Sequence, residues 1–200
     1  MAAPGYGNPA VVGLAGFGTT TLLLQFHNLG WMGTGVVFCT AMMFGGLAQL
    51  IAGLQEFKTG SNFGYSAFSS YGAFWLALGF IFLILDLQAV PGSWVGAHLK
   101  VSGTDVGLFL LAFTFYTAIM FIGSLAIHTA MVLTFLTLLL GFIGLDLVFL
   151  ADAKGLLTIT AWDLVICALL AWYMMAHVIF LQVYGKNILP VGKPWVKKPA

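Results

Sequence analysis

Residues 63–85 have the sequence FGYSAFSSYGAFWLALGFIFLIL, in which no side chain is charged. An α-helix rises about 1.5 Å per residue, so about 20 apolar residues cross about 30 Å of hydrocarbon. The run is therefore long enough to span a membrane. Its residues Ser66, Ser69, Ser70 and Tyr71 add hydroxyl groups without adding charge. Such a stretch predicts a transmembrane helix that lines a passage for a small polar solute rather than a plain lipid anchor.

Five further apolar runs of similar length flank this helix, at residues 9–27, 33–54, 105–126, 130–150 and 159–184. Charged residues make up 6% of the chain, whereas a soluble domain carries about a quarter. Hydrophobic residues make up 61%. The composition therefore predicts an all-α membrane protein with six transmembrane helices per protomer, and it leaves no room for a separate soluble domain.

The six spans divide the chain into three parts. We expect an N-terminal tail at residues 1–7, a transmembrane domain at residues 8–186 and a C-terminal tail at residues 187–200. The first of these has no basic residue and no cleavage pattern, so it does not predict a signal peptide. Cys39 and Cys167 lie inside apolar runs, and we expect buried thiols rather than a disulfide or a metal site.

The distribution of lysines predicts the orientation in the membrane. With six spans, both termini lie on one side. The lysines on that side are Lys58, Lys186, Lys193, Lys197 and Lys198, and those on the other are Lys100 and Lys154. Cytoplasmic loops are enriched in lysine, so we expect both ends in the cytoplasm and the protein in the plasma (inner) membrane. Trp31, Trp94 and Trp162 then fall near the outer interface, which suits their amphipathic rings.

Polar residues deep in the spans are the first candidates for function. Gln49 lies mid-span, where an unpaired amide costs several kcal/mol, so it either lines a pore or clasps a neighbouring helix. The threonines of residues 19–21 offer hydroxyls to a pore or to their own helix carbonyls. Ser66 and Ser70 are four residues apart and share one helix face, which we expect to meet a pore. Residues 56–62, EFKTGSN, predict a short ion-paired turn.

The titratable residues do not form a catalytic constellation. Surface or capping roles are expected for His27, His98, His128, Asp86, Asp146 and Asp163, which fall at span ends or in loops. His177 lies inside the last span, but no cysteine or carboxylate stands near it at metal-ligand spacing. We therefore expect neither an enzyme nor a metal or cofactor site. A net charge of +1 does not indicate a nucleic-acid partner.

Two stretches of the sequence resemble a known family. Residues 8–30, NPAVVGLAGFGTTTLLLQFHNLG, resemble the opening signature of the acetate uptake transporters, the succinate–acetate permease family, with Val11 and Val12 in place of a Pro-Leu pair. Residues 44–75, FGGLAQLIAGLQEFKTGSNFGYSAFSSYGAFW, are similar to that family along their full length. The ILPVG sequence at residues 188–192 also resembles the family's C-terminal pattern.

The resemblance implies a six-helix protomer around its own central pore, assembled as a homohexamer in the lipid bilayer. It implies transport of acetate and other short carboxylates such as succinate. It further implies an apolar constriction made by Phe17, Tyr71 and Leu138, and a small residue in the sixth span, Ala171, that influences the size of the substrate.

A carboxylate in such a pore needs hydrogen-bond donors in place of its hydration shell, and a fixed lysine would bind it too tightly for release. We expect Asn8 and Pro9 to place a positive helix end at one mouth of the pore. The candidate donors within the pore are Thr20, Gln49 and Ser70.

Other functions fit the same residues. A narrow uncharged pore would also suit urea, ammonia or formate. A membrane scaffold or sensor would use the polar residues for helix packing alone. Within the transport hypothesis, an anion channel and a proton-coupled permease are both open, because no sequence feature decides between them.

Overall fold

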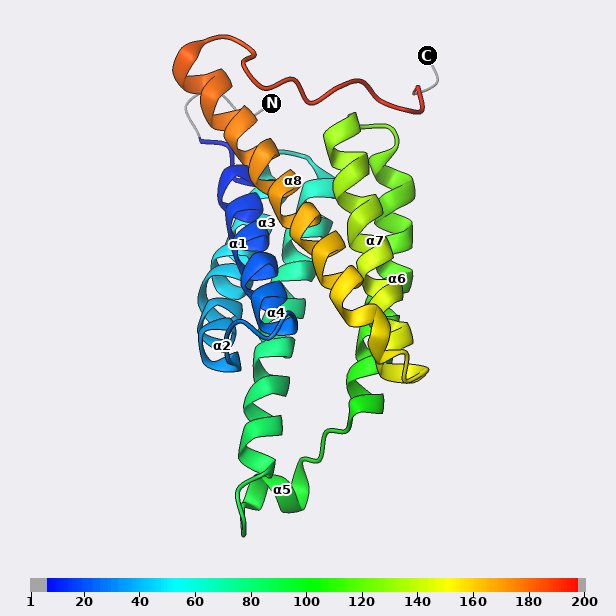
Figure 1. Cartoon of the computed structure of the whole chain (residues 1–200). Coiled ribbons are helices and arrows are strands. Elements are labelled where there is room, and N and C mark those ends of the chain that lie inside the picture. The colour runs from blue at the N-terminus through cyan, green and yellow to red at the C-terminus, as the bar shows by residue number, and fades with distance from the viewer. Residues whose placement is uncertain (1–6, 198–200) are drawn as a thin grey trace.

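A computed structural model describes residues 7–197, which form only helices and loops (Figure 1). The helices are α1 (Ala10–Asn28), α2 (Thr34–Met42), the π-helix η1 (Met43–Ala48), α3 (Gln49–Lys58), α4 (Asn62–Gln88), α5 (Trp94–His98), α6 (Gly103–Ser124), α7 (Thr129–Leu150), the 3₁₀-helix η2 (Lys154–Leu156) and α8 (Leu157–Tyr184).

Within residues 7–197, six helical units are long and apolar enough to cross a membrane. The second unit combines α2, η1 and α3 (Thr34–Lys58), and the sixth combines η2 and α8 (Lys154–Tyr184). The other four are α1, α4, α6 and α7. Each predicted apolar run overlaps one of these units, which confirms the predicted all-α fold with six transmembrane helices.

The π-helix η1 is a feature that the apolar pattern did not predict. It lies against α1 and α4, and its glycines permit close contact between the backbones. A Cβ atom on Gly45 would lie 2.5 Å from Thr20 Oγ1, and one on Gly16 would clash with the Phe44 carbonyl oxygen. Small residues at such crossings let membrane helices approach without lipid between them. The contact fixes the start of α3, and therefore Gln49, next to α1.

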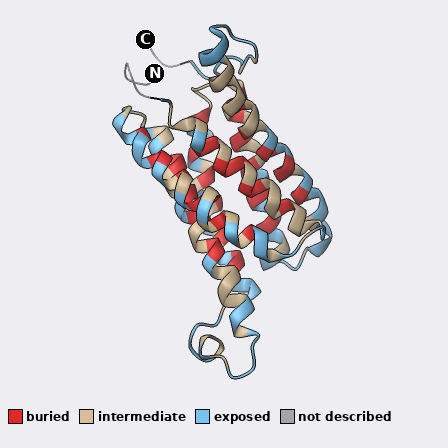
Figure 2. Cartoon of the chain, turned by 90° about the vertical axis from the view of Figure 1, so that its left-hand side faces the viewer, coloured by how far each residue is buried: buried red, intermediate tan, exposed pale blue. Residues whose placement is uncertain are grey.

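The helices pack as a bundle around a shared core. Here α1 packs against α8, α6 against α7, α7 against α8, and α3 against α4. Figure 2 shows the buried residues along the middle of the bundle. Outward-facing apolar side chains are highly exposed, among them Phe115, Ile119 and Ile159. Exposed apolar surface of this extent fits contact with lipid or with another protein rather than with water.

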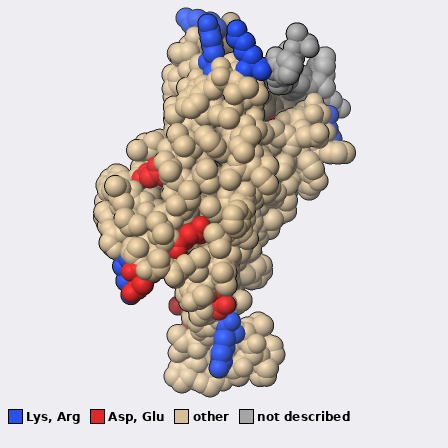
Figure 3. Space-filling model, turned by 90° about the vertical axis from the view of Figure 1, so that its right-hand side faces the viewer, with Lys and Arg blue, Asp and Glu red and all other residues tan. Residues whose placement is uncertain are grey.

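The two ends of the bundle carry different residues. The start of α1, the α3–α4 turn and the C-terminal segment lie at one end, which we call the terminal end (Figure 1). Lysines of the C-terminal segment gather there (Figure 3). The α5 hairpin lies at the opposite, hairpin end with Trp94, and the rings of Trp31 and Trp162 meet there at 5.9 Å. The side of a membrane that each end faces stays a prediction.

The C-terminal segment, residues 187–197, is irregular but bound to the bundle. The backbone N–H of Ala130 donates to the Val191 carbonyl at 2.9 Å, and the Thr129 hydroxyl donates to the Lys193 carbonyl at 2.9 Å. These bonds tie the segment to the start of α7. Residues 1–6 and 198–200 of the two predicted tails, including Lys198, lie outside the described residues.

Two local predictions are wrong. Cys39 is exposed, not buried, because one face of a membrane-spanning helix can point away from the protein without becoming polar. Cys167 is buried, and its thiol donates to the Thr134 carbonyl at 3.4 Å. The turn at residues 56–62 is present, but Glu56 and Lys58 form no ion pair: Glu56 is buried and Lys58 points out of the bundle.

Candidate functional site

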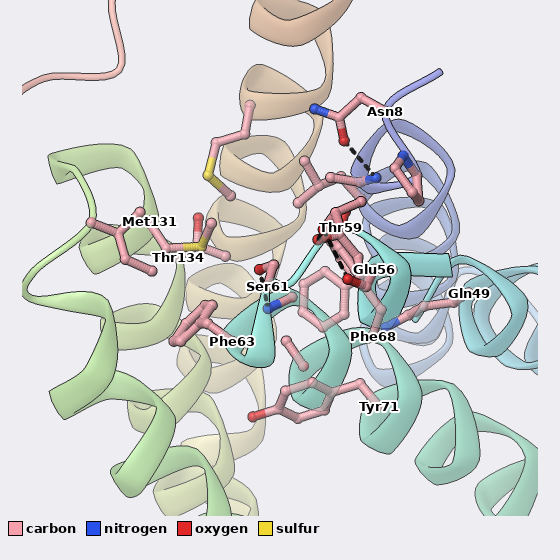
Figure 4. A pocket seen from close by; sticks show the side chains of 18 of the residues that line it. Asn8, Gln49, Glu56, Thr59, Ser61, Phe63, Phe68, Tyr71, Met131 and Thr134 are labelled. Carbon is pink, nitrogen blue, oxygen red and sulfur yellow. Dashed lines mark hydrogen bonds between the residues drawn. The ribbon is translucent and has the colours of Figure 1, made fainter. Parts of the chain in front are cut away.

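A cavity of about 440 Å³, which we call the wide cavity, lies at the terminal end of the bundle (Figure 4). Its outer residues come from helix ends: Asn8 and Pro9 before α1, Thr59 and Ser61 between α3 and α4, and Ile127 before α7. Its deeper walls come from α1, α3, α4, α7 and α8. The cavity therefore extends from the helix ends into the middle of the bundle.

Three helices begin at the wide cavity, and a side chain caps each of them. Asn8 accepts a hydrogen bond from the first turn of α1 at 2.9 Å, Ser61 from α4 at 3.0 Å and His128 from α7 at 3.1 Å. Other first-turn N–H groups are paired as well: Val11 and Val12 donate to the Asn8 and Pro9 carbonyls, and Ala130 donates to the Val191 carbonyl. Each helix start also carries about half a unit of positive charge from the aligned peptide dipoles. The three starts together favour an anion in the cavity.

The polar side chains in the wide cavity are mostly neutral. Gln49 and Thr134 are 1% and 4% exposed, and Gln49 Oε1 has no hydrogen-bond partner among residues 7–197. Glu56 contributes a buried carboxylate. Within the described part of the chain, no lysine lines the cavity. An anion would therefore meet helix ends, amides and hydroxyls rather than a fixed cation.

A second cavity of about 30 Å³, the narrow cavity, lies beyond the wide one toward the hairpin end. Its lining is largely apolar, with Leu24, Phe142 and Leu145 among the walls. Two polar residues of α1 interrupt it. Thr21 Oγ1 has no hydrogen-bond partner among residues 7–197, and the Gln25 side-chain amide donates to the Thr21 carbonyl at 3.1 Å.

Three residues line both cavities: Phe17, Tyr71 and Leu138. They come from α1, α4 and α7, and each is less than one-tenth exposed. The Phe17 and Tyr71 rings meet edge to face, with centroids 6.0 Å apart. Residues shared by two consecutive cavities stand between them. The trio predicted as a constriction is therefore brought together at the point where the wide cavity meets the narrow one.

A hydrogen bond to α6 positions Tyr71 between the two cavities. Its hydroxyl lies 2.7 Å from the Thr117 hydroxyl, and Thr117 is fully buried. Phe135 also packs beside the ring, with centroids 6.3 Å apart. Because the ring is held from two sides, its position is determined by the fold rather than by a ligand.

The other predicted site residues divide into two groups. Asn8, Pro9 and Gln49 line the wide cavity, whereas Thr20, Ser70 and Ala171 line neither cavity. Thr20 packs against Gly45 of η1. Ser70 is half-buried, and Ala171 is fully buried in the helix core.

Sequence reasoning did not place Gln25, Glu56, Thr134 and Met174 at a pathway, but all four line a cavity; Thr21, one of the three threonines considered for a pore, also lines one. A signal was available for Thr21 and Gln25, because they follow Phe17 by four and eight residues and share its helix face. Thr134 precedes Leu138 by four residues on α7. The face of α4 that carries Ser66 and Ser70 was expected to meet a pore, but it lies beside the face that lines the cavity. Ser66 instead pairs with the Tyr116 hydroxyl at 2.7 Å.

Two titratable residues outside the cavities contact other parts of the protein. Asp146 accepts a hydrogen bond from the Thr114 hydroxyl at 2.6 Å. His177 Nδ1 lies 2.6 Å from the Leu189 carbonyl oxygen, in the C-terminal segment. Burial lowers the pKa of His128, and the nearby His177 lowers it further. Among residues 7–197, Glu56 is the sole carboxylate that lines either cavity.

Comparison with known proteins links this arrangement to transport. A family model described as the GPR1/FUN34/yaaH family matches residues 2–185. The succinate-acetate/proton symporter SatP of Escherichia coli (strain K12) is 34% identical over 190 residues, which cover 93% of this chain and 95% of that protein. Acetate permease A of Emericella nidulans is 34% identical over 149 residues, which cover 69% of this chain and 48% of that protein.

A solved structure has the same fold. The structure of the bacterial acetate channel SatP superimposes with a TM-score of 0.84 and 32% sequence identity. The match covers 94% of this chain and 99% of that chain. The bundle, and not only its helix count, is therefore shared with that channel.

Proposed function

This chain belongs to the GPR1/FUN34/yaaH family, and on that premise we propose that it transports acetate and other short carboxylates such as succinate across a membrane. The similar proteins are named as a symporter, a permease and a channel, which supports transport rather than catalysis. The pathway consists of the wide cavity, the constriction and the narrow cavity of one protomer.

The observation that carries this proposal is that Phe17, Tyr71 and Leu138 line both cavities. A polar compartment with three helix starts on one side of an apolar ring supports passage of a small molecule with one charged and one apolar end. Acetate has that form. Its carboxylate is compensated by donors in the wide cavity, while its methyl group matches the apolar ring.

We assign the steps of passage to particular groups. The positive ends of α1 and α4, near Asn8 and Ser61, stabilise a carboxylate that enters from the terminal end, and the Gln49 amide offers donors deeper in the cavity. The ring of Phe17, Tyr71 and Leu138 then limits the cross-section to about the size of acetate. Beyond it, the Thr21 hydroxyl offers the next polar contact in the narrow cavity.

The predicted residues away from the cavities have indirect roles in this proposal. Thr20 holds η1 against α1 and so positions Gln49. Ala171 keeps α8 close to the bundle, so that Met174, less than one turn later, reaches the wide cavity. Ser70 lies beside Tyr71 on α4 and supports the helix face next to the gate.

We further propose a homohexamer in the plasma (inner) membrane, with both termini in the cytoplasm. The exposed apolar side chains Phe115, Ile119 and Ile159 are available for lipid or for neighbouring protomers. The lysines at the terminal end support a cytoplasmic position for that end.

Labelled-acetate flux into liposomes that hold the purified protein tests the proposal. The internal pH is fixed, and flux is measured with and without an imposed pH gradient. Uphill accumulation that follows the gradient would identify a proton-coupled permease, whereas fast downhill flux would identify a channel. Competition by urea, ammonia or formate tests the other solutes. Folded protein without any flux would contradict transport and favour a scaffold.

A further inference from the structure

The wide cavity contains a carboxylate of the protein where the proposed substrate is itself a carboxylate. Glu56, near the end of α3, lines the cavity and is 6% exposed. The Thr59 hydroxyl donates to the Glu56 backbone carbonyl at 2.8 Å and more weakly to the Glu56 Oε2 atom over 3.4 Å (Figure 4). Among residues 7–197, no lysine forms an ion pair with it. A buried carboxylate without a cation needs another source of compensation, and the nearby helix starts supply one.

Within residues 7–197, the elements packed around Glu56 present no other charged group to it. Asn8 and Pro9 face the cavity from the start of α1, Ser61 from the start of α4, Met131 from α7 and Met174 from α8. All of these are uncharged.

The other titratable groups nearby are directed elsewhere. Tyr71 lies deeper in the cavity and is paired with Thr117. Lys58 is exposed on α3. His128 and His177 lie on α7 and α8, but neither lines the cavity; His128 caps α7, and His177 contacts the C-terminal segment. Among residues 7–197, Glu56 is therefore the residue whose protonation changes the net charge of the wide cavity.

On this geometry, and resting on the proposed function, we propose that Glu56 is the charge filter of the transport pathway. The ionised carboxylate occupies the positive field of the helix starts and repels an entering anion. A proton taken from water makes the side chain neutral, frees that field for the substrate, and provides an O–H donor for its carboxylate. Acid pH admits the anion, and neutral pH opposes it.

The filter separates substrates by charge, whereas the constriction separates them by size. Coulomb repulsion is proportional to the charge of the substrate. The succinate dianion is therefore repelled about twice as strongly as acetate at the same position. At neutral pH, Glu56 favours monocarboxylates over dicarboxylates even where both would fit through the ring.

The variant Glu56→Gln tests this inference because it keeps the shape of the side chain and removes its charge. Full-length protein is purified and reconstituted, and protein-free liposomes supply the background of passive acid leak. With about pH 7.5 on both sides, we expect acetate flux to rise about threefold in the variant. Succinate flux should rise about tenfold, because doubling the repulsion energy squares the factor by which flux is reduced. The rise in flux of the wild-type protein on acidification to about pH 5.5 should be largely lost in the variant.

Two matched variants complete the design. Glu56→Asp keeps the carboxylate and should keep the dependence on pH. Asp152→Asn removes an exposed carboxylate at the hairpin end, paired there with Lys154, and should leave both fluxes unchanged. If Glu56→Gln does not fold, Thr59→Val removes a donor that favours the ionised carboxylate, so flux at neutral pH should rise.

The outcomes separate the filter from the transport function. If wild-type protein carries acetate and the folded Glu56→Gln variant has the same flux ratio and pH dependence, or a lower flux, the filter is overturned and transport stands. The same holds if Thr59→Val is the variant that folds and its flux does not rise. If the wild-type protein carries neither acid, the proposed function fails first, and the filter fails with it.

Discussion

The wide and narrow cavities lie on opposite sides of one ring of residues, yet they have different chemistry. The wide cavity, of about 440 Å³, contains three helix starts, an amide, hydroxyls and a carboxylate. The narrow cavity, of about 30 Å³, is lined mostly by aromatic and aliphatic side chains. The difference is one of order: a carboxylate that enters from the terminal end meets compensating groups before it meets the apolar ring.

In the proposed pathway, this order would separate two kinds of selectivity. We expect groups in the wide cavity to determine how well an anion is held, because they replace its hydration shell. We expect groups in the ring to determine what passes, because they exclude by cross-section. Substitutions on the two sides should therefore change different measured quantities, which the following experiments test.

The largest effect is expected from Phe17→Ala, which would join the two cavities. The flux of longer acids such as butyrate, relative to acetate, should rise about tenfold, the scale on which an apolar pocket discriminates a methylene group. Tyr71→Ala should act in the same direction. Flux of a series of labelled acids is the measurement, with Phe17→Leu as the control that retains bulk. An unchanged size profile would remove both residues from the gate.

Gln49→Leu should change the other quantity. It removes an amide that is 1% exposed in the wide cavity, so the acetate concentration for half-maximal flux should rise about tenfold, the lower end of the effect of a lost hydrogen bond to an ion. The size profile should stay as in the wild type. Gln55→Leu, on an exposed face of the same helix, is the matched control. If Gln49→Leu instead changes the size profile, the wide cavity and the ring do not control separate quantities.

The threonines of α1 sharpen the comparison on the narrow side. Thr21→Val removes an unpaired hydroxyl from the narrow cavity, and acetate flux should fall about fivefold, since net hydrogen-bond energies are about 1 kcal/mol. Thr20→Val changes a residue that packs on Gly45 and should leave flux within experimental error. Parallel flux assays of the two variants decide between them. A fall in flux for Thr20→Val but not for Thr21→Val would place the pathway on the face of α1 that contacts η1.

The smallest effect concerns the cap of α7 at the wide cavity. Burial lowers the pKa of His128 in the folded protein, so the unfolded chain binds a proton first as the pH falls. The cap's contribution, about 1 kcal/mol for a typical N-cap, is therefore present above about pH 6.5 and is lost as the pH falls through the lowered pKa.

Thermal unfolding in detergent at about pH 7.5 and pH 5.5 measures this contribution. His128→Asn keeps an acceptor that does not titrate and should lose part of the acid-induced decrease in melting temperature. An equal decrease in wild type and variant would show that other groups are responsible.

The membrane-spanning fold could be predicted because length and charge alone identify an apolar span. The runs at 63–85 and 130–150 correspond to α4 and α7, and both could be predicted without knowledge of tertiary contacts. The π-helix could not be predicted in the same way, since Gly45 and Gly46 permit several backbone forms, and packing against α1 and α4 selects one.

The candidate site was predictable only in part, for a reason of geometry. Phe17, Tyr71 and Leu138 were expected at a constriction from a resemblance, and they do lie together between the cavities. Thr20 and Ser70 were chosen by polarity, but the face of a helix decides what a residue meets. Glu56 was expected in a short ion-paired turn, and only the three-dimensional arrangement places it inside a cavity.

The π-helix at Met43–Ala48 has a consequence for insertions and deletions in this chain. A π-turn contains one residue more than an α-turn over the same span. Removal of a single residue within this segment could therefore restore a regular α-helix with little change in length or polarity. Successive residues of an α-helix are turned by about 100°, so Gln49 and Glu56 would rotate together away from the wide cavity. Deletion of one codon here would leave a well-folded membrane helix in which Gln49 and Glu56 no longer face the wide cavity.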